Sequence, residues 1–259
     1  MRSRLRLRVA RSRTPTRRSE MSLRLTTAGE SHGPGLTCII EGLPAGLMVD
    51  RDSIDRDLAR RQLGHGRGGR MKIERDSVNV TGGIRHGRTL GGPIALQVVN
   101  RDYANWVQRM SPWPVDGDVA EVHLPRPGHA DLVGTQKYGL TDVRDVLERA
   151  SARETASRVA AGALGKVFLR QFGIEVRSHV HSIGPLTASS PAELALARDG
   201  ASHDWWRSVE ESPIRTGDAQ FAAAATEMIR AARTAGDTLG GVFEVIAYGV
   251  PIGLGTYGQ

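Results

Sequence analysis

The chain has 259 residues, of which 39% are hydrophobic and 24% are charged, so it can bury a sizeable core and is not a wholly disordered chain. The single cysteine, Cys38, excludes an intrachain disulfide and a thiolate metal cluster, and no apolar run approaches the roughly 18 residues that a membrane span needs. The formal net charge of +7 comes entirely from residues 1–20, which hold eight arginines and one glutamate, and the remaining body is neutral.

Three interpretations compete for the Arg-rich segment 1–20. The segment is either a polybasic arm that binds nucleic acid or anionic lipid, or a transit peptide, or sequence upstream of a true start at Met21. A strand pattern begins directly after Met21, with Leu23 and Leu25, which favours the upstream-start interpretation over the transit peptide and, last, the functional arm. We therefore expect an extension over 1–20 outside the fold and one domain over 21–259, with neither nucleic acid nor a membrane as a partner.

The first half of the body alternates between strand-like and helix-like stretches. Asp52 or Ser53 is expected to cap a helix that ends near Leu63, with Ile54 and Leu58 four residues apart on one face. The strands predicted in this half lie over residues 22–28, 36–43, 71–81 and 93–99.

The second half begins with residues 100–127, which hold four prolines and predict a long loop. The clearest helix is predicted over 142–172, because apolar residues from Ala156 to Phe168 recur at helical spacing, and Gly173 is placed to end it. The remaining predicted elements are a strand over 174–184, a short helix that starts at Pro191, a helix over 219–233 and a strand over 241–249.

The first candidate site is Gly29-Glu30-Ser31-His32-Gly33, between two predicted strands. Glycines on both sides let the backbone approach a ligand closely, and a histidine there can donate a proton at neutral pH. A tight turn with an incidental histidine is the simpler interpretation, and this pattern alone does not exclude it.

The second candidate site is a Gly-rich stretch over residues 60–88, with eight basic residues against Glu74 and Asp76. The arginine fork binds two oxygens of a phosphate or carboxylate at once, although the Gly-Lys-Ser/Thr of a nucleotide phosphate loop is missing. Because the body is neutral overall, this local concentration favours an anionic ligand over a merely solvated loop. The basic residues are Arg60, Arg61, Arg67, Arg70, Lys72, Arg75, Arg85 and Arg88.

The third candidate site combines Arg126-Pro127-Gly128-His129-Ala130-Asp131 with the segment from Arg149 to Thr155. Arg149 and Arg153 lie four residues apart near the start of the predicted long helix, so we expect them to share a face, and a helix start offers free amides to an anion. Ordinary surface polarity is the alternative. Two histidines and several arginines suit acid–base chemistry on a multiply charged anion, and the sequence has no His-x-x-x-His pair for a metal.

Taken together, in this order and spacing, the motifs closely resemble the chorismate synthase family, from Met21 to the last residue. The resemblance implies an α+β fold, a β-α-β sandwich with helices between antiparallel sheets, assembled as a homotetramer. It also implies a lyase of the shikimate pathway, which serves aromatic amino acid biosynthesis. The matching blocks are Gly29-Glu30-Ser31-His32-Gly33, Arg60-Arg61-Gln62-Leu63-Gly64, Gly66-Arg67-Gly68, Arg70-Met71, Arg126-Pro127-Gly128-His129-Ala130-Asp131 and Ala150-Ser151-Ala152-Arg153-Glu154-Thr155-Ala156.

The reaction implied by the resemblance is an anti-1,4-elimination of phosphate and a proton from 5-enolpyruvylshikimate 3-phosphate, which gives chorismate. The family needs reduced FMN (FMNH2) although there is no net redox change. Most bacterial members take reduced flavin from an outside source, here an external flavin reductase, whereas some eukaryotic members reduce it with NADPH themselves. We expect a cytoplasmic location.

The resemblance also assigns roles to single residues. His32 matches the histidine that protonates the departing phosphate, and His129 matches the one beside the flavin. Substrate carboxylates are expected on Arg61, Arg67 and Arg126, the substrate phosphate near Arg70 and Arg153, and the flavin on Arg149, Ala150 and Ser151.

The sequence departs from the family in three places. His65 stands where the family often has a tyrosine or another residue, and it is given no role. The region between Arg101 and Arg126 is shorter than in close relatives, and family members continue past Gln259 with further flavin-binding segments and an Arg-x-Asp motif whose aspartate assists removal of the substrate proton. Three hypotheses follow: an active enzyme whose sequence is incomplete, an inactive truncated product, and an Arg-rich nucleic-acid binder that acts through segment 1–20.

Overall fold

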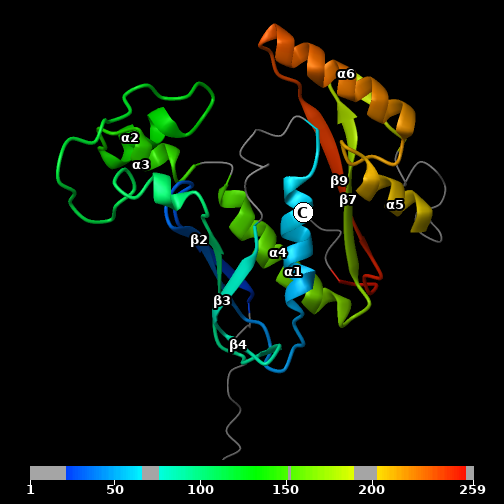
Figure 1. The fold of residues 1–259 in the computed structure, drawn as a ribbon. Coiled ribbons are helices and arrows are strands. Elements are labelled where there is room, and N and C mark those ends of the chain that lie inside the picture. The colour runs from blue at the N-terminus through cyan, green and yellow to red at the C-terminus, as the bar shows by residue number, and fades with distance from the viewer. Residues whose placement is uncertain (1–21, 66–75, 151–152, 190–202, 255–259) are drawn as a thin grey trace, which may run out of the picture.

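The computed structural model describes residues 22–65, 76–150, 153–189 and 203–254, in which two antiparallel sheets enclose a pair of helices (Figure 1). The first sheet has the strand order β1-β2-β6-β3, and the second has the order β8-β7-β9. The strands of the first sheet are β1 (Arg24–Ala28), β2 (Gly35–Glu41), β3 (Val78–Gly82) and β6 (Ile94–Val99).

One face of the first sheet is apolar because its strands alternate. In β2 the buried residues are Leu36, Cys38 and Ile40, and the antiparallel register places them opposite Val98, Leu96 and Ile94 of β6. Directly opposed apolar pairs on one face are the unit that stabilises such a sheet. The predicted strands 22–28, 36–43 and 93–99 are thus confirmed, as is the end of 71–81, whose residues 71–75 lie outside the described ranges.

The apolar face is covered by two helices, α1 (Arg51–Gln62) and α4 (Glu154–Arg170). Helix α1 buries Ile54 and Leu58, as predicted, but its cap is Asp50, whose carboxylate accepts a hydrogen bond from the backbone N of Asp52 at 3.1 Å. Helix α4 packs on α1 and on both sheets, and its buried face consists mainly of small residues, which allow close approach. The small residues are Ala156, Ser157, Ala160, Ala161 and Ala163, and the larger Leu164 and Val167 complete the buried face.

The single helix predicted over 142–172 is wrong. The chain instead forms a short helix, α3 (Arg144–Leu147), and then α4, which starts at Glu154. The apolar stripe itself begins only at Ala156, so it predicts the second helix and not the first. Between the two helices the chain makes contacts with distant segments, described below, in place of helical packing.

The second sheet consists of β7 (Glu175–Ile183), β8 (Leu186–Thr187) and β9 (Gly241–Tyr248), in agreement with the strands predicted over 174–184 and 241–249. Helix α6 (Ala219–Ala235), also predicted, packs Phe221 and Ala225 against it. Its N-cap is Asp218, whose carboxylate accepts a hydrogen bond from the backbone N of Phe221 at 2.9 Å. Helix α5 (His203–Glu211) was not predicted, and the helix expected from Pro191 falls outside the described residues.

Figure 1 shows α1 and α4 between the two sheets, which is the expected α+β sandwich. A lobe with α2 (Asp131–Tyr138) and α3 lies beside the first sheet (Figure 1). The loop predicted over 100–127 leads into this lobe and holds only a 3₁₀ turn over Tyr103–Asn105. Short strands β4 (Ile84–Arg85) and β5 (Arg88–Thr89) form a separate hairpin. Within the described residues, no helix is both long and apolar enough to cross a bilayer.

Candidate active site

The turn after β1 places His32 against Glu148, at the end of α3. The Nδ1 atom of His32 lies 2.8 and 2.9 Å from the two carboxylate oxygens of Glu148, and its backbone N–H donates to the same carboxylate at 2.9 Å. The backbone N of Ser31 donates to the carbonyl oxygen of Glu148 at 3.0 Å. Since the Glu148 side chain is only 1% exposed, its hydrogen bonds are shielded from water and hold the turn in place.

The turn requires glycine at its start. Gly29 has a φ of +106°, and a Cβ atom there would lie 2.4 Å from the carbonyl oxygen of Gly35. The turn closes with a hydrogen bond from the Gly33 N to the Glu30 carbonyl at 3.1 Å, and the buried Asn100 donates its side-chain N to the Gly33 carbonyl at 2.9 Å. The tight turn predicted from the sequence is therefore present, and its histidine is not incidental, because it is bound to a buried acid.

Trp106 covers the His32 ring. The two ring centroids are 3.8 Å apart with an interplanar angle of 28°, and the Trp106 Nε1 donates to Asp102 at 2.9 Å. The guanidinium groups of Arg109 and Arg144 lie 5.5 and 5.8 Å from the Trp106 centroid. His32, with 22% of its side chain exposed, thus sits in a partly enclosed site between an indole ring and a buried carboxylate.

A second buried group joins Arg61 and Arg153 through Asp76. Their guanidinium nitrogens lie 3.3 and 3.2 Å from the two carboxylate oxygens, and the three side chains are 7%, 5% and 1% exposed. Arg61 also donates to the Thr155 hydroxyl at 2.9 Å, and Arg153 to the Val99 carbonyl at 3.3 Å. Two guanidinium groups around one carboxylate leave this group of three residues with a positive charge, which suits the binding of an anion.

Arg126 is fixed by Asp131, the first residue of α2. Two parallel hydrogen bonds of 2.9 Å run from the Arg126 guanidinium to the carboxylate, and the Arg126 backbone N donates to it at 2.9 Å. Hydrogen bonding to Arg126 lowers the pKa of the fully buried Asp131 to about 2. The Arg126 guanidinium also donates to the Leu147 carbonyl at 3.4 Å, so within the lobe it links the start of α2 to the end of α3. The nearby His129 is exposed.

Arg149 and Arg153 do not share a face, contrary to expectation, because α4 begins only at Glu154. Arg149 points to β1, where it donates to the Thr27 carbonyl at 3.0 Å and to the Thr27 hydroxyl at 2.8 Å, whereas Arg153 is buried on Asp76. Ala150 follows Arg149 and is half-buried.

Three predicted site residues, Arg67, Arg70 and Ser151, lie outside the described residues. The structure therefore brings His32 close to the segment with Arg149 and Ala150, and brings Arg61 to Arg153. The roles assigned to all of these residues stay predictions.

Sequence reasoning missed Glu148, Trp106 and Asp76. Glu148 directly precedes the Arg149-Ala150-Ser151 stretch, and Trp106 is a tryptophan within a loop, where an aromatic ring has no strand or helix to pack in. These were the available signals. They are weak, because the partner of each residue is distant in the sequence.

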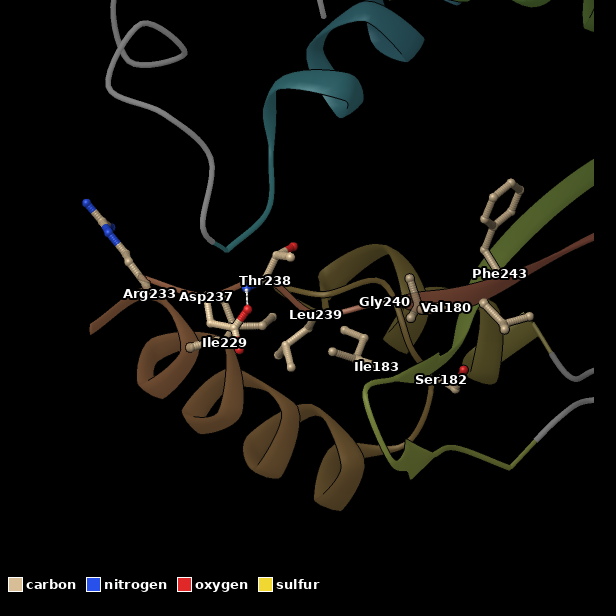
Figure 2. Close-up of a pocket in the computed structure, with 13 residues that line it drawn as sticks. Val180, Ser182, Ile183, Ile229, Arg233, Asp237, Thr238, Leu239, Gly240 and Phe243 are labelled. Carbon is tan, nitrogen blue, oxygen red and sulfur yellow. Dashed lines mark hydrogen bonds between the residues drawn. The ribbon is translucent and has the colours of Figure 1, made fainter. Parts of the chain in front are cut away.

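A separate cavity of about 800 Å³ lies between α6, β7 and the start of β9 (Figure 2). Its labelled lining residues include the aliphatic Val180, Ile183, Ile229 and Leu239, together with polar and charged side chains such as Arg233 and Asp237 (Figure 2). None of the residues predicted to carry chemistry lines it.

A sequence model described as "Chorismate synthase" matches residues 23–259. The chain belongs to the chorismate synthase family. It is 56% identical over 241 residues to the chorismate synthase of Symbiobacterium thermophilum, and the matched region covers 91% of this chain and 60% of that protein. It is 53% identical over 237 residues to the chorismate synthase of Rubrobacter xylanophilus, and the matched region covers 92% of this chain and 59% of that protein.

A solved structure described as "Crystal Structure of Chorismate Synthase" has a TM-score of 0.71 and is 38% identical, over 92% of this chain and 61% of the other. This chain therefore has the fold of the chorismate synthase family. The chain spans about 60% of the length of the chorismate synthases that it matches.

Proposed function

We propose that the protein is a chorismate synthase, a lyase that converts 5-enolpyruvylshikimate 3-phosphate to chorismate in the biosynthesis of aromatic amino acids. The observation that carries the proposal is the placement of His32, held by a buried carboxylate in a chain whose family match covers residues 23–259. A histidine fixed in this way is suited to donate a proton to a leaving phosphate oxygen.

The substrate carries two carboxylates and a phosphate, so its burial requires several fixed cations. Arg61 and Arg153, both buried on Asp76, supply two, and the bidentate pair with Asp131 fixes Arg126, a third of whose side chain is exposed. In this proposal the C–O bond to phosphate breaks and its electron pair leaves with the phosphate, while a ring C–H bond breaks, its electron pair forms the second ring double bond, and its proton is released to solvent, from which His32 is protonated again. His32 gives its proton to the departing phosphate.

The side chains of the lobe fit a flavin, which combines a flat apolar ring system with a phosphate. Leu124, Leu132 and Val133 are 84%, 53% and 67% exposed and lie in the same lobe as the exposed His129 and the partly exposed Arg126. Apolar surface beside cations is the chemistry that such a ligand requires.

On this proposal, His129, Arg149 and Ala150 hold the flavin, together with Ser151. Reduced FMN, when bound, supplies an electron and takes it back. The external flavin reductase, the homotetramer and the cytoplasmic location remain predictions from the resemblance. The nucleic-acid alternative has no support in the family match, which begins after segment 1–20.

The test is an anaerobic assay of the purified 259-residue chain with the substrate and chemically reduced FMN, in which chorismate and released phosphate are measured. We expect both products in equal amounts, and a loss of orders of magnitude in turnover in His32→Ala and in His129→Ala. A folded chain that releases no phosphate would refute the activity proposed for these 259 residues. Retention of turnover by His32→Ala would remove the role given to that residue.

A further inference from the structure

The His32 ring is held on one edge by an acid that also binds its backbone. The two carboxylate oxygens of Glu148 lie 2.8 and 2.9 Å from the Nδ1 atom of His32, and the carboxylate accepts a hydrogen bond from the His32 backbone N–H at 2.9 Å. The ring and the main chain of His32 are thus fixed to a single carboxylate. Rotation of the ring by half a turn would put a carbon atom against that carboxylate in place of Nδ1.

We propose that Glu148 is the positioning residue for His32: it holds a proton on Nδ1 and so makes Nε2 the ring nitrogen that exchanges a proton with the ligand. A carboxylate can only accept hydrogen bonds, so Nδ1 must donate at these distances. Nε2 then carries a proton when the ring is cationic and none when it is neutral. The part of this inference that concerns proton exchange rests on the proposed function, whereas the position of the proton does not.

Two neighbours support the geometry. The stacked Trp106, with centroids 3.8 Å apart, fixes the plane of the His32 ring, and the electron-rich face of an indole stabilises a cationic ring. Arg144 lies 3.6 Å from the Glu148 carboxylate, 17% exposed, and balances its charge within the site. Glu148 sets the direction of the ring edge, and Trp106 sets its plane.

The first experiment measures which nitrogen of His32 carries the proton, from the ¹⁵N shifts of the 259-residue chain labelled at histidine, at a pH where the ring is neutral. The His32 signals are assigned by their loss in His32→Gln. We expect Nδ1–H in the wild type and a shift toward Nε2–H in Glu148→Gln, because the amide can both donate and accept. The matched control is Asp145→Asn, an exposed acid of the same helix that has the same change from carboxylate to amide.

The proposal is overturned if the wild type carries the proton on Nε2, or if Glu148→Gln leaves the tautomer unchanged. Should Glu148→Gln not fold, as judged by circular dichroism, the tautomer of the wild type decides alone. This measurement needs neither substrate nor flavin, so it stands even if the proposed function fails.

The second experiment is kinetic and uses the assay described above. We expect kcat to fall between about 10-fold and 10⁴-fold in Glu148→Gln with little change in KM, as for other acids that orient a catalytic histidine. Glu148→Asp, which keeps the charge, should recover part of the loss, and Asp145→Asn should match the wild type. An unchanged kcat in Glu148→Gln, in an active wild type, would overturn the positioning role, whereas no turnover in the wild type would refute the proposed function.

Discussion

Replacement of Asp76 by Asn tests whether the buried charges of the site are as interdependent as the geometry indicates. Asp76 is 1% exposed and receives the guanidinium groups of Arg61 and Arg153, which are 7% and 5% exposed. The change keeps the shape of the side chain but leaves two buried cations without their shared carboxylate. Removing one partner of a buried ion pair costs about 3–5 kcal/mol.

The assay is urea unfolding followed by circular dichroism. With a slope of about 3 kcal/mol/M, the upper end for small proteins, the midpoint should fall by about 1–1.7 M. The control is Asp204→Asn, which breaks an exposed pair with Arg207 (82% and 58% exposed) and should change stability by less than about 0.5 kcal/mol. Inorganic phosphate should raise the midpoint of Asp76→Asn more than that of the control, because an anion can replace the lost carboxylate.

The reasoning is refuted if Asp76→Asn unfolds within about 0.5 kcal/mol of the wild type. It is also refuted, for the anion site alone, if phosphate stabilises the variant and the control equally.

Three further predictions concern single residues. Arg126 lowers the pKa of Asp131 to about 2, so their pair stabilises the folded state at pH values above the unfolded pKa of about 4. This contribution to stability is lost as the pH falls toward 2. Urea midpoints measured across this pH range should therefore fall less steeply in Asp131→Asn than in the wild type. Burial raises the pKa of the Cys38 thiol to about 11, so thiol reagents at pH 8 should label Cys38 only after unfolding, as followed by mass spectrometry. Rapid labelling of the native chain would contradict the position of Cys38 in the core. Gly29→Ala should lower the free energy of unfolding by about 1–3 kcal/mol, because φ is +106° and a Cβ atom would meet the Gly35 carbonyl oxygen at 2.4 Å. A urea midpoint equal to that of the wild type would show that the turn relaxes freely.

The core of the fold could be predicted because its signals are local. The alternation of Leu36, Cys38 and Ile40 and the helical spacing from Ala156 onward are each contained within one element, and each element buries the residues that the pattern selects. Helix α2 gave no such signal, because its apolar residues Leu132 and Val133 are exposed in the structure and form no core-facing stripe.

The chemistry of the site was predictable only in part, because its contacts join distant segments. The motifs selected His32 and Arg153, but the acids that hold them are distant in the sequence. Glu148 is 116 residues from His32, and Asp76, the partner of Arg153, lies within the Gly-rich stretch over 60–88. No local period relates such positions. The predicted shared face of Arg149 and Arg153 failed for a related reason, since the boundary of α4 is set by packing and not by charge spacing.

The segment between α3 and α4 acts as a spacer of fixed length. Leu147 contacts Arg126, Glu148 holds the turn at His32, Arg149 reaches β1, and Arg153 meets Asp76, so four positions in close succession serve four separate parts of the molecule. An inserted or deleted residue here would change the length of chain between the contacts made before and after it. Such a change would misalign several of these contacts together, whereas a single substitution in this segment removes the contacts of one residue.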